Sequence, residues 1–114
     1  MIDTIVVESP DCYLKNEKHT DKQHTEIMFD KMLKTTLNSS FANQGQICLC
    51  GSRILIQRGI YQKFKEAFVE KVKKMKVGNP LNEDSKLGAI VSKPHYEKIL
   101  SYIEIAKEEG GKIL

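Results

Sequence analysis

The 114-residue sequence has no tryptophan and only three prolines and three cysteines. An odd cysteine count without paired spacing argues against a disulfide framework and favours a reducing, cytoplasmic setting. No apolar run approaches the roughly 20 residues of a membrane span, so no membrane partner is expected. The net charge of +3 arises from 18 basic and 15 acidic residues. Lysine and glutamate alternate along the chain, which is typical of a solvated surface, and we expect no nucleic acid partner.

The length of 114 residues predicts one small domain or part of a larger one, and the hydrophobic fraction of 40% is adequate for a core. Residues 15–24 are polar and charged, which favours a loop. We therefore expect residues 1–24 to be a divergent or disordered N-terminal segment. The structured domain is expected to cover residues 25–114.

Periodic apolar residues predict three helices. The first is expected from Thr25, as its N-cap, to the vicinity of Gly45, with apolar positions at Met28, Phe29, Met32, Leu33, Thr36, Leu37 and Phe41. The second covers residues 60–75 and is strongly amphipathic. The third follows Ser92 as N-cap, with Pro94 in its first turn, and ends at Gly110. Its apolar face, expected to point inward, comprises Tyr96, Ile99, Leu100, Ile103 and Ala106.

Short apolar runs at residues 53–57 and 112–114 predict two strands. The expected order after the first helix is strand, helix, loop, helix, strand. This order indicates the α/β class, with both strands in one sheet and the helices packed against it.

Cys48 is the residue best placed to carry chemistry. The first helix is expected to break at Gly45, where glycine lets the backbone turn sharply just before the cysteine. Such a turn can direct the sulfur and the Cys48 backbone N–H at one carbonyl group, and the N–H would stabilise the oxyanion formed on attack. Taken alone, however, a cysteine is more often a small buried apolar residue.

The residues around Cys48 resemble the active-site segment of aldehyde dehydrogenases. The run Phe41-Ala42-Asn43-Gln44-Gly45-Gln46-Ile47-Cys48 matches the pattern Phe-x-Asn-x-Gly-Gln-x-Cys. Further segments that resemble this family follow in order: Gly51-Ser52-Arg53, Tyr61 with Phe64, Val77-Gly78-Asn79-Pro80-Leu81, residues 87–92 and residues 106–111. The sequence around the cysteine is most similar to that of family members that act on 2-aminomuconic and 2-hydroxymuconic semialdehydes. The resemblance covers residues 29–114.

The resemblance implies that Cys48 attacks an aldehyde to give a thiohemiacetal. Hydride then passes to NAD or NADP, and water releases a carboxylic acid from the thioester. Asn43, Gln44, Gly45 and Gln46 are expected to shape the turn and the oxyanion site. The expected substrate is a small aldehyde, with a semialdehyde as one option.

Several parts of that family's machinery have no counterpart in the sequence. The Glu-Leu-Gly-Gly-Lys segment with the general base is missing, and so is a glycine-rich nucleotide-binding element. We therefore expect part of a catalytic domain that binds the cofactor poorly and does not turn over by itself. The alternative is a non-catalytic product that acts as an interaction module, with self-association through its apolar helix faces.

Other candidate residues favour simpler interpretations. Cys48 and Cys50 could form a redox or metal pair, but two thiols do not complete a tetrahedral site. Surface, loop or helix-end roles are expected for the remaining histidines, lysines and cysteine: Cys12, His19, His24, His95, Lys71, Lys73, Lys74 and Lys76.

Overall fold

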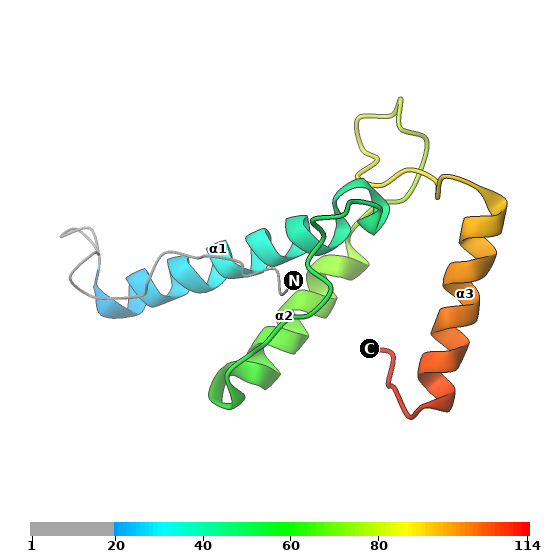
Figure 1. The fold of residues 1–114 in the computed structure, drawn as a ribbon. Helices are drawn as coiled ribbons and strands as arrows, with labels where there is room; N and C mark the ends of the chain where they lie inside the picture. The colour runs from blue at the N-terminus through cyan, green and yellow to red at the C-terminus, as the bar shows by residue number, and fades with distance from the viewer. Residues whose placement is uncertain (1–19) are drawn as a thin grey trace. The chain divides into compact units, whose positions relative to one another are not determined.

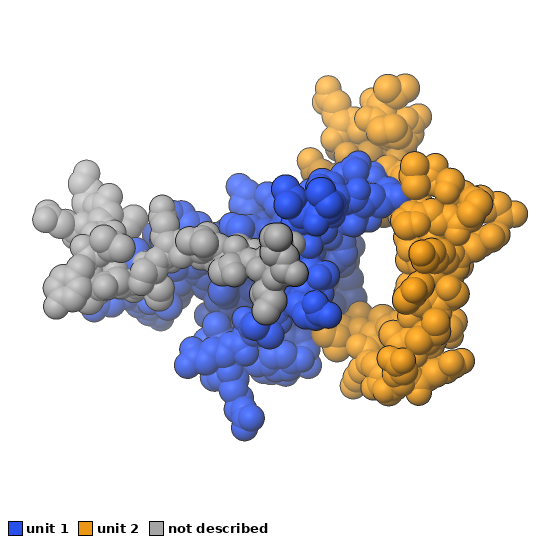
Figure 2. All heavy atoms as spheres, in the orientation of Figure 1, with its two compact units in different colours: residues 1–74 blue, residues 75–114 orange. Residues whose placement is uncertain are grey.

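The computed structural model describes residues 20–114, which belong to two compact units, Met1–Lys74 and Met75–Leu114 (Figure 2). The first unit contains helix α1 (Asp21–Phe41), the 3-10 turns η2 (Ala42–Gly45) and η3 (Arg58–Ile60), and helix α2 (Tyr61–Lys73) (Figure 1). The second contains helix α3 (Lys93–Glu108). None of these helices combines the length and the apolar character needed to cross a membrane.

Helix α1 begins five residues earlier than the sequence predicts. Thr20 is its N-cap, and the side chain of Thr20 accepts a hydrogen bond from the Gln23 backbone N–H at 3.3 Å. In return, the Gln23 side chain accepts from the Thr20 backbone N–H at 2.9 Å, which completes a capping box. The prediction of a loop over residues 21–24 was therefore wrong, because the first turn carries no apolar residue to reveal the helix. The rest of the predicted N-terminal segment lies outside the described residues.

Helices α1 and α2 pack through a row of phenylalanine rings. Phe64 is the largest fully buried side chain among the described residues, with 2% of its surface exposed. Its ring meets Phe29 of α1 edge-on at 6.3 Å and stacks on Phe68 at 5.6 Å between centroids. Phe68 in turn contacts Phe41 at the last position of α1. The predicted amphipathic character of α2 is confirmed, and Met28 and Leu33, two of the apolar positions predicted on α1, are buried.

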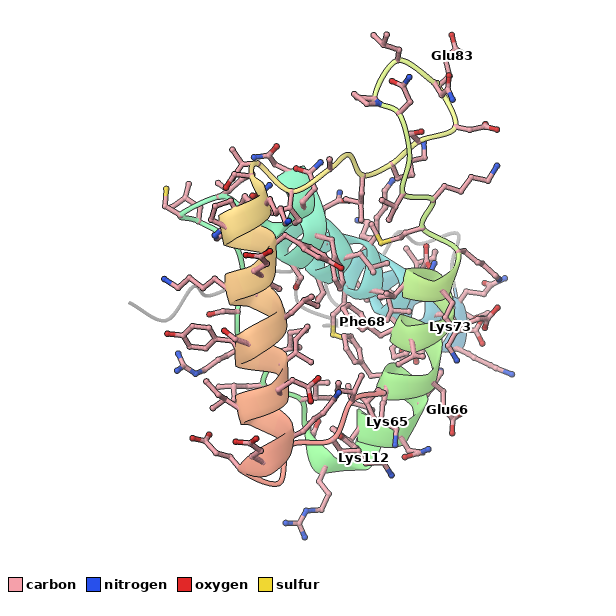
Figure 3. All side chains as sticks on the ribbon, turned by 90° about the vertical axis from the view of Figure 1, so that its right-hand side faces the viewer. Lys65, Glu66, Phe68, Lys73, Glu83 and Lys112 are labelled. Atoms are coloured by element: carbon pink, nitrogen blue, oxygen red, sulfur yellow. The ribbon has the colours of Figure 1, made fainter. Side chains whose placement is uncertain are left out.

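The outer side of α2 is charged. Figure 3 shows Glu66 and Lys73 on the side of the helix away from Phe68. Lys71 reaches α1 and pairs with Asp30 at 2.9 Å, and Lys63 lies 4.5 Å above the Phe29 ring. These exposed contacts add little stability compared with the packed phenylalanine rings, because water screens the charges.

The strands predicted at residues 53–57 and 112–114 are not formed among residues 20–114. The only β pairing found there is an isolated bridge between Val77 and Leu87. Leu55 is 87% exposed and Ile113 is 62% exposed, so both apolar runs face solvent. A strand needs a partner for its backbone N–H and C=O groups, and neither run has one in this part of the chain.

The second unit begins with a hydrogen-bonded loop. Within it, Gly78 N–H donates to the Leu87 carbonyl, and the N–H groups of Lys86 and Leu87 both donate to the Lys76 carbonyl. Ser92 then caps α3 by accepting from the His95 N–H at 3.3 Å, with Pro94 in the first turn, as predicted.

The C-terminal end of α3 is also confirmed, since Gly110 adopts a left-handed φ of 87° just after the helix. The predicted burial of its apolar face is wrong for the described residues, because α3 has no buried residue and Tyr96 is 50% exposed. The pattern marks a face that can be buried, but this unit supplies nothing to cover it.

Candidate functional site

Three consecutive residues turn the chain sharply at the end of α1. Asn43, Gln44 and Gly45 all have left-handed backbones, with φ of 49°, 59° and 75°. This conformation costs roughly 1–2 kcal/mol for each non-glycine residue. The Gln46 N–H donates to the Asn43 carbonyl at 3.0 Å, and the Gln46 side chain donates to that of Gln44 at 3.3 Å. The predicted turn-shaping residues therefore lie together in one strained, hydrogen-bonded turn.

The turn opens a loop that closes on the end of α1. The N–H of Gly51 lies 3.0 Å from the Ser39 carbonyl oxygen and 3.2 Å from the Ser39 hydroxyl. A second turn lies inside this loop, where the Cys50 N–H donates to the Ile47 carbonyl at 3.0 Å. Residues 42–50, which we call the cysteine loop, are therefore fixed at their base and internally bonded.

Cys48 occupies the second turn of the cysteine loop and is exposed. Its neighbours Ile47 and Leu49 are also exposed, at 40% and 73%. Within residues 20–114, no carbonyl accepts a hydrogen bond from the Cys48 N–H. An exposed cysteine whose backbone N–H has no carbonyl partner in this part of the chain is compatible with the nucleophile that the sequence predicts.

Cys50 has a different environment. Cys50 is half-buried, and its Sγ lies 3.9 Å from the Ala42 carbonyl oxygen. This contact joins the two ends of the cysteine loop. Both cysteines are free thiols. In the described part of the chain, no three His, Cys, Asp or Glu side chains come together as metal ligands.

The described histidines and lysines that the sequence singled out belong to elements other than the cysteine loop. His24 is 7% exposed inside α1, so the prediction of a solvated loop residue was wrong. His95 lies in the first turn of α3, where its N–H donates to Ser92. Three of the lysines are paired with carboxylates: Lys71 with Asp30, Lys74 with Glu70 and Lys76 with Asp84. Cys12 and His19 lie outside the described residues.

Sequence reasoning missed the role of Ser39 in this site. The hydrogen bond to Gly51 joins residues twelve positions apart. No local sequence pattern predicts such a contact, because Ser39 is an ordinary polar residue near the end of a helix. The only available signal was its place two residues before the end of the periodic helix, where carbonyl groups lose their helical partners.

A small surface hollow of about 470 Å³ lies on the first half of α1 and is lined by Gln23, Glu26, Ile27, Asp30 and Lys31. None of these residues belongs to the cysteine loop. The hollow therefore does not connect to the candidate nucleophile.

The helical pair and the loop define a site built around one accessible thiol. Residues 24–114 match the aldehyde dehydrogenase family, and the chain belongs to that family. The resemblance found in the sequence is thereby confirmed, including its similarity to muconic semialdehyde dehydrogenases. The chain is 52% identical over 82 residues to 2-aminomuconic semialdehyde dehydrogenase from Bos taurus, and 49% identical over 84 residues to that from Homo sapiens.

These relatives are much longer than this chain. The alignments cover 72% and 74% of the chain but only 17% of each relative. Betaine aldehyde dehydrogenase from Staphylococcus aureus, solved in complex with NAD+, is similar in structure, with a TM-score of 0.71 and 41% identity. That match covers 72% of this chain and 16% of the other. Another structure of the same protein carries a BME-modified cysteine.

The described residues form no binding site that fits NAD, the cofactor that the family uses. A dinucleotide site requires a glycine-rich turn between a paired strand and a helix. Among the described residues, helix α2 follows the turn η3 and helix α3 follows a serine cap, and neither helix has a paired strand before it.

Proposed function

We propose that Cys48 is the nucleophile of an aldehyde dehydrogenase active site, of which this chain supplies the cysteine loop and the helices behind it. The observation that carries the proposal is the exposed Cys48 thiol in a loop closed by the contact between Gly51 and Ser39. A nucleophile must be accessible and held in one orientation, and both the exposure of Cys48 and the hydrogen-bonded base of its loop support this role.

The proposed step is the addition of Cys48 to an aldehyde. The sulfur forms a bond to the carbonyl carbon, the carbon–oxygen π bond breaks, and the thiol proton ends on the oxygen. The product is a thiohemiacetal, and no electron acceptor is needed. We propose that the Cys48 backbone N–H donates to the developing oxyanion, and the absence of a carbonyl partner for it among residues 20–114 supports this role.

Oxidation of that adduct requires a hydride acceptor, for which the described residues form no site. The chain also spans 17% of the length of the relatives it matches. We therefore propose that the isolated chain forms the adduct without turning over. The names of the relatives support a semialdehyde as substrate, and the relative solved with NAD+ supports NAD as the cofactor of a complete enzyme.

Competitive alkylation tests this function directly. The purified chain is treated with limiting iodoacetamide in the presence and absence of an aliphatic semialdehyde, and each cysteine is quantified by mass spectrometry. We expect Cys48 to react fastest and the aldehyde to protect it selectively. Cys48→Ser serves as the control for assignment. Equal labelling of all three cysteines, with no protection by aldehyde, would sink the proposal.

A second function is favoured by the exposed face of α3. Tyr96, Leu100 and Ile103 follow helical spacing and are 50%, 43% and 37% exposed. We propose that this face associates with another polypeptide, which makes the chain an interaction module. Sedimentation velocity would show concentration-dependent assembly that Leu100→Lys weakens. Monomeric behaviour of the unmodified chain at all accessible concentrations excludes self-association through this face.

The apolar run at residues 53–57 fits the same need for a neighbour. We propose that it pairs as a strand in the complete enzyme, which would restore the expected α/β sheet. Its exposed apolar side chains, Ile54 at 38% and Leu55 at 87%, support this proposal.

A further inference from the structure

The cysteine loop is closed at its base by one backbone N–H, that of Gly51, which is shared between two acceptor atoms of Ser39. The Gly51 N–H lies 3.0 Å from the Ser39 carbonyl oxygen and 3.2 Å from the Ser39 Oγ. Such three-centre hydrogen bonds are common at helix ends. Here the donor comes from the far end of the loop rather than from the next residues of the helix.

The position of Ser39 explains why it receives this bond. It lies in the last turn of α1, where carbonyl groups have no N–H one turn further along the helix. The Ala42 N–H serves the Asn38 carbonyl, and the chain then enters the left-handed turn. The Ser39 carbonyl is therefore left for Gly51, and the hydroxyl strengthens the tie with a second acceptor.

The neighbouring serine provides a comparison. The Ser40 hydroxyl is buried and has no hydrogen-bond partner among the described residues. Both serines occupy the last turn of α1, and both carry a hydroxyl shielded from water to some degree. Only Ser39 connects the helix to the far end of the cysteine loop. If the loss of any serine hydroxyl at this helix end impaired function, substitutions of Ser39 and Ser40 would have equal effects.

From this geometry we infer that Ser39 is a positioning residue for the Cys48 nucleophile, an inference that rests on the proposed function. Ser39 acts through Gly51: its hydroxyl and carbonyl hold the end of the loop against α1, which confines the turn that presents Cys48. The same tie keeps Cys50 half-buried across the loop, where its Sγ approaches the Ala42 carbonyl.

Loosening this tie has opposite consequences for the two thiols. Cys50 gains exposure when the end of the loop leaves α1, so its alkylation accelerates. Cys48 is already exposed, so it gains no access, but it loses the fixed orientation that favours addition to an aldehyde. The ratio of the two reactivities therefore reports positioning, whereas general unfolding would make all cysteines equally reactive.

The test uses the full chain and three substitutions. Ser39→Ala removes the hydroxyl acceptor and is expected to lower the Cys48 to Cys50 alkylation ratio about five-fold, the effect typical of one hydrogen bond. It should also weaken protection of Cys48 by an aldehyde. Ser39→Thr keeps the hydroxyl and should restore both readouts. Ser40→Ala, the matched control, should leave both unchanged. Hydrogen exchange at the Gly51 amide should accelerate in Ser39→Ala only.

The outcomes separate this inference from the function on which it rests. A selective, aldehyde-protected Cys48 that is unaffected by Ser39→Ala overturns the role of Ser39 and leaves the nucleophile in place. An equal effect of Ser40→Ala, or no rescue by threonine, also overturns it. An unselective Cys48 in the unmodified chain overturns the proposed function, and the positioning role fails with it.

Discussion

The ring of Phe68 on α2 packs against the ring of Phe41, the last residue of α1, with 6.1 Å between centroids and a tilt of 32°. The next residue along the chain, Ala42, begins the cysteine loop. Phe68 also stacks on the buried Phe64. A continuous row of rings thus connects the core between the helices to the point where α1 gives way to the candidate nucleophile.

Phe64→Ala and Phe68→Ala are expected to differ in magnitude. Phe64 is 2% exposed, and its replacement should cost about 3–5 kcal/mol of unfolding free energy through lost burial and a cavity. Phe68 is only half-buried, so about 2 kcal/mol is expected. Urea unfolding followed by far-ultraviolet circular dichroism measures both. Tyr61→Ala, at an exposed ring, should change stability by less than about 1 kcal/mol. A Tyr61 effect as large as that of Phe64 would contradict the described core.

Thr20→Ala tests where α1 begins. Thr20 closes a capping box with Gln23, so its loss should cost about 1 kcal/mol, and Thr20→Ser should recover most of that stability. Thr25→Ala is the natural control, because sequence reasoning placed the cap there. In the structure, the Thr25 hydroxyl instead donates to the Asp21 carbonyl at 2.9 Å, an interaction that stabilises a helix little. Chemical denaturation distinguishes the two sites, and a larger loss at Thr25 would restore the original prediction.

These two threonines also show what the sequence can and cannot predict. Apolar periodicity located the three helices, because that pattern is local and strong. The start of α1 escaped it, because a capping box is built from polar residues. Similarly, Gly45 and Cys48 predict a turn that carries a thiol. The contact between Ser39 and Gly51 joins residues twelve positions apart and depends on how the loop folds back, so no local pattern predicts it. The predicted strands require pairing partners that are not formed among residues 20–114, and the burial of α3 requires a neighbour that its own unit does not supply.

Acidification is expected to weaken α2 through Glu70. The ammonium of Lys74, by hydrogen bonding and by its charge, holds the pKa of the Glu70 carboxyl below its ordinary value. A lowered pKa means that the folded state favours the ionised carboxylate. The resulting stabilisation is therefore present above the ordinary carboxyl pKa and disappears as the pH falls through the lowered value.

Urea midpoints across the acidic range measure this effect, which should be small because the pair is exposed. Both Glu70→Gln and Lys74→Met should remove the same part of the pH dependence, and added salt should reduce it in the unmodified chain. If Lys74→Met left the pH dependence intact, another group would have to be responsible.

Gly45→Ala should lower the stability of the fold, whereas Gln44→Gly should leave it equal or raise it. Gly45 has a φ of 75°, and a Cβ at this position would lie 3.4 Å from the Ser40 carbonyl oxygen. Alanine there should cost roughly 1–2 kcal/mol, because an L residue resists the left-handed conformation. Gln44 already bears that strain at a φ of 59°, so glycine should relieve part of it, less the loss of its side-chain hydrogen bond with Gln46.

The same pair of variants separates stability from reactivity at Cys48. Gly45→Ala should lower both the unfolding free energy and the selectivity of Cys48 alkylation, because it distorts the turn that presents the thiol. Gln44→Gly should leave stability equal or higher while reducing selectivity, because a second glycine beside Gly45 lets the loop sample more conformations. Denaturation and competitive alkylation on the same samples provide both numbers. If the two variants changed selectivity only in proportion to stability, the turn would act on Cys48 through folding alone rather than through the orientation of the loop.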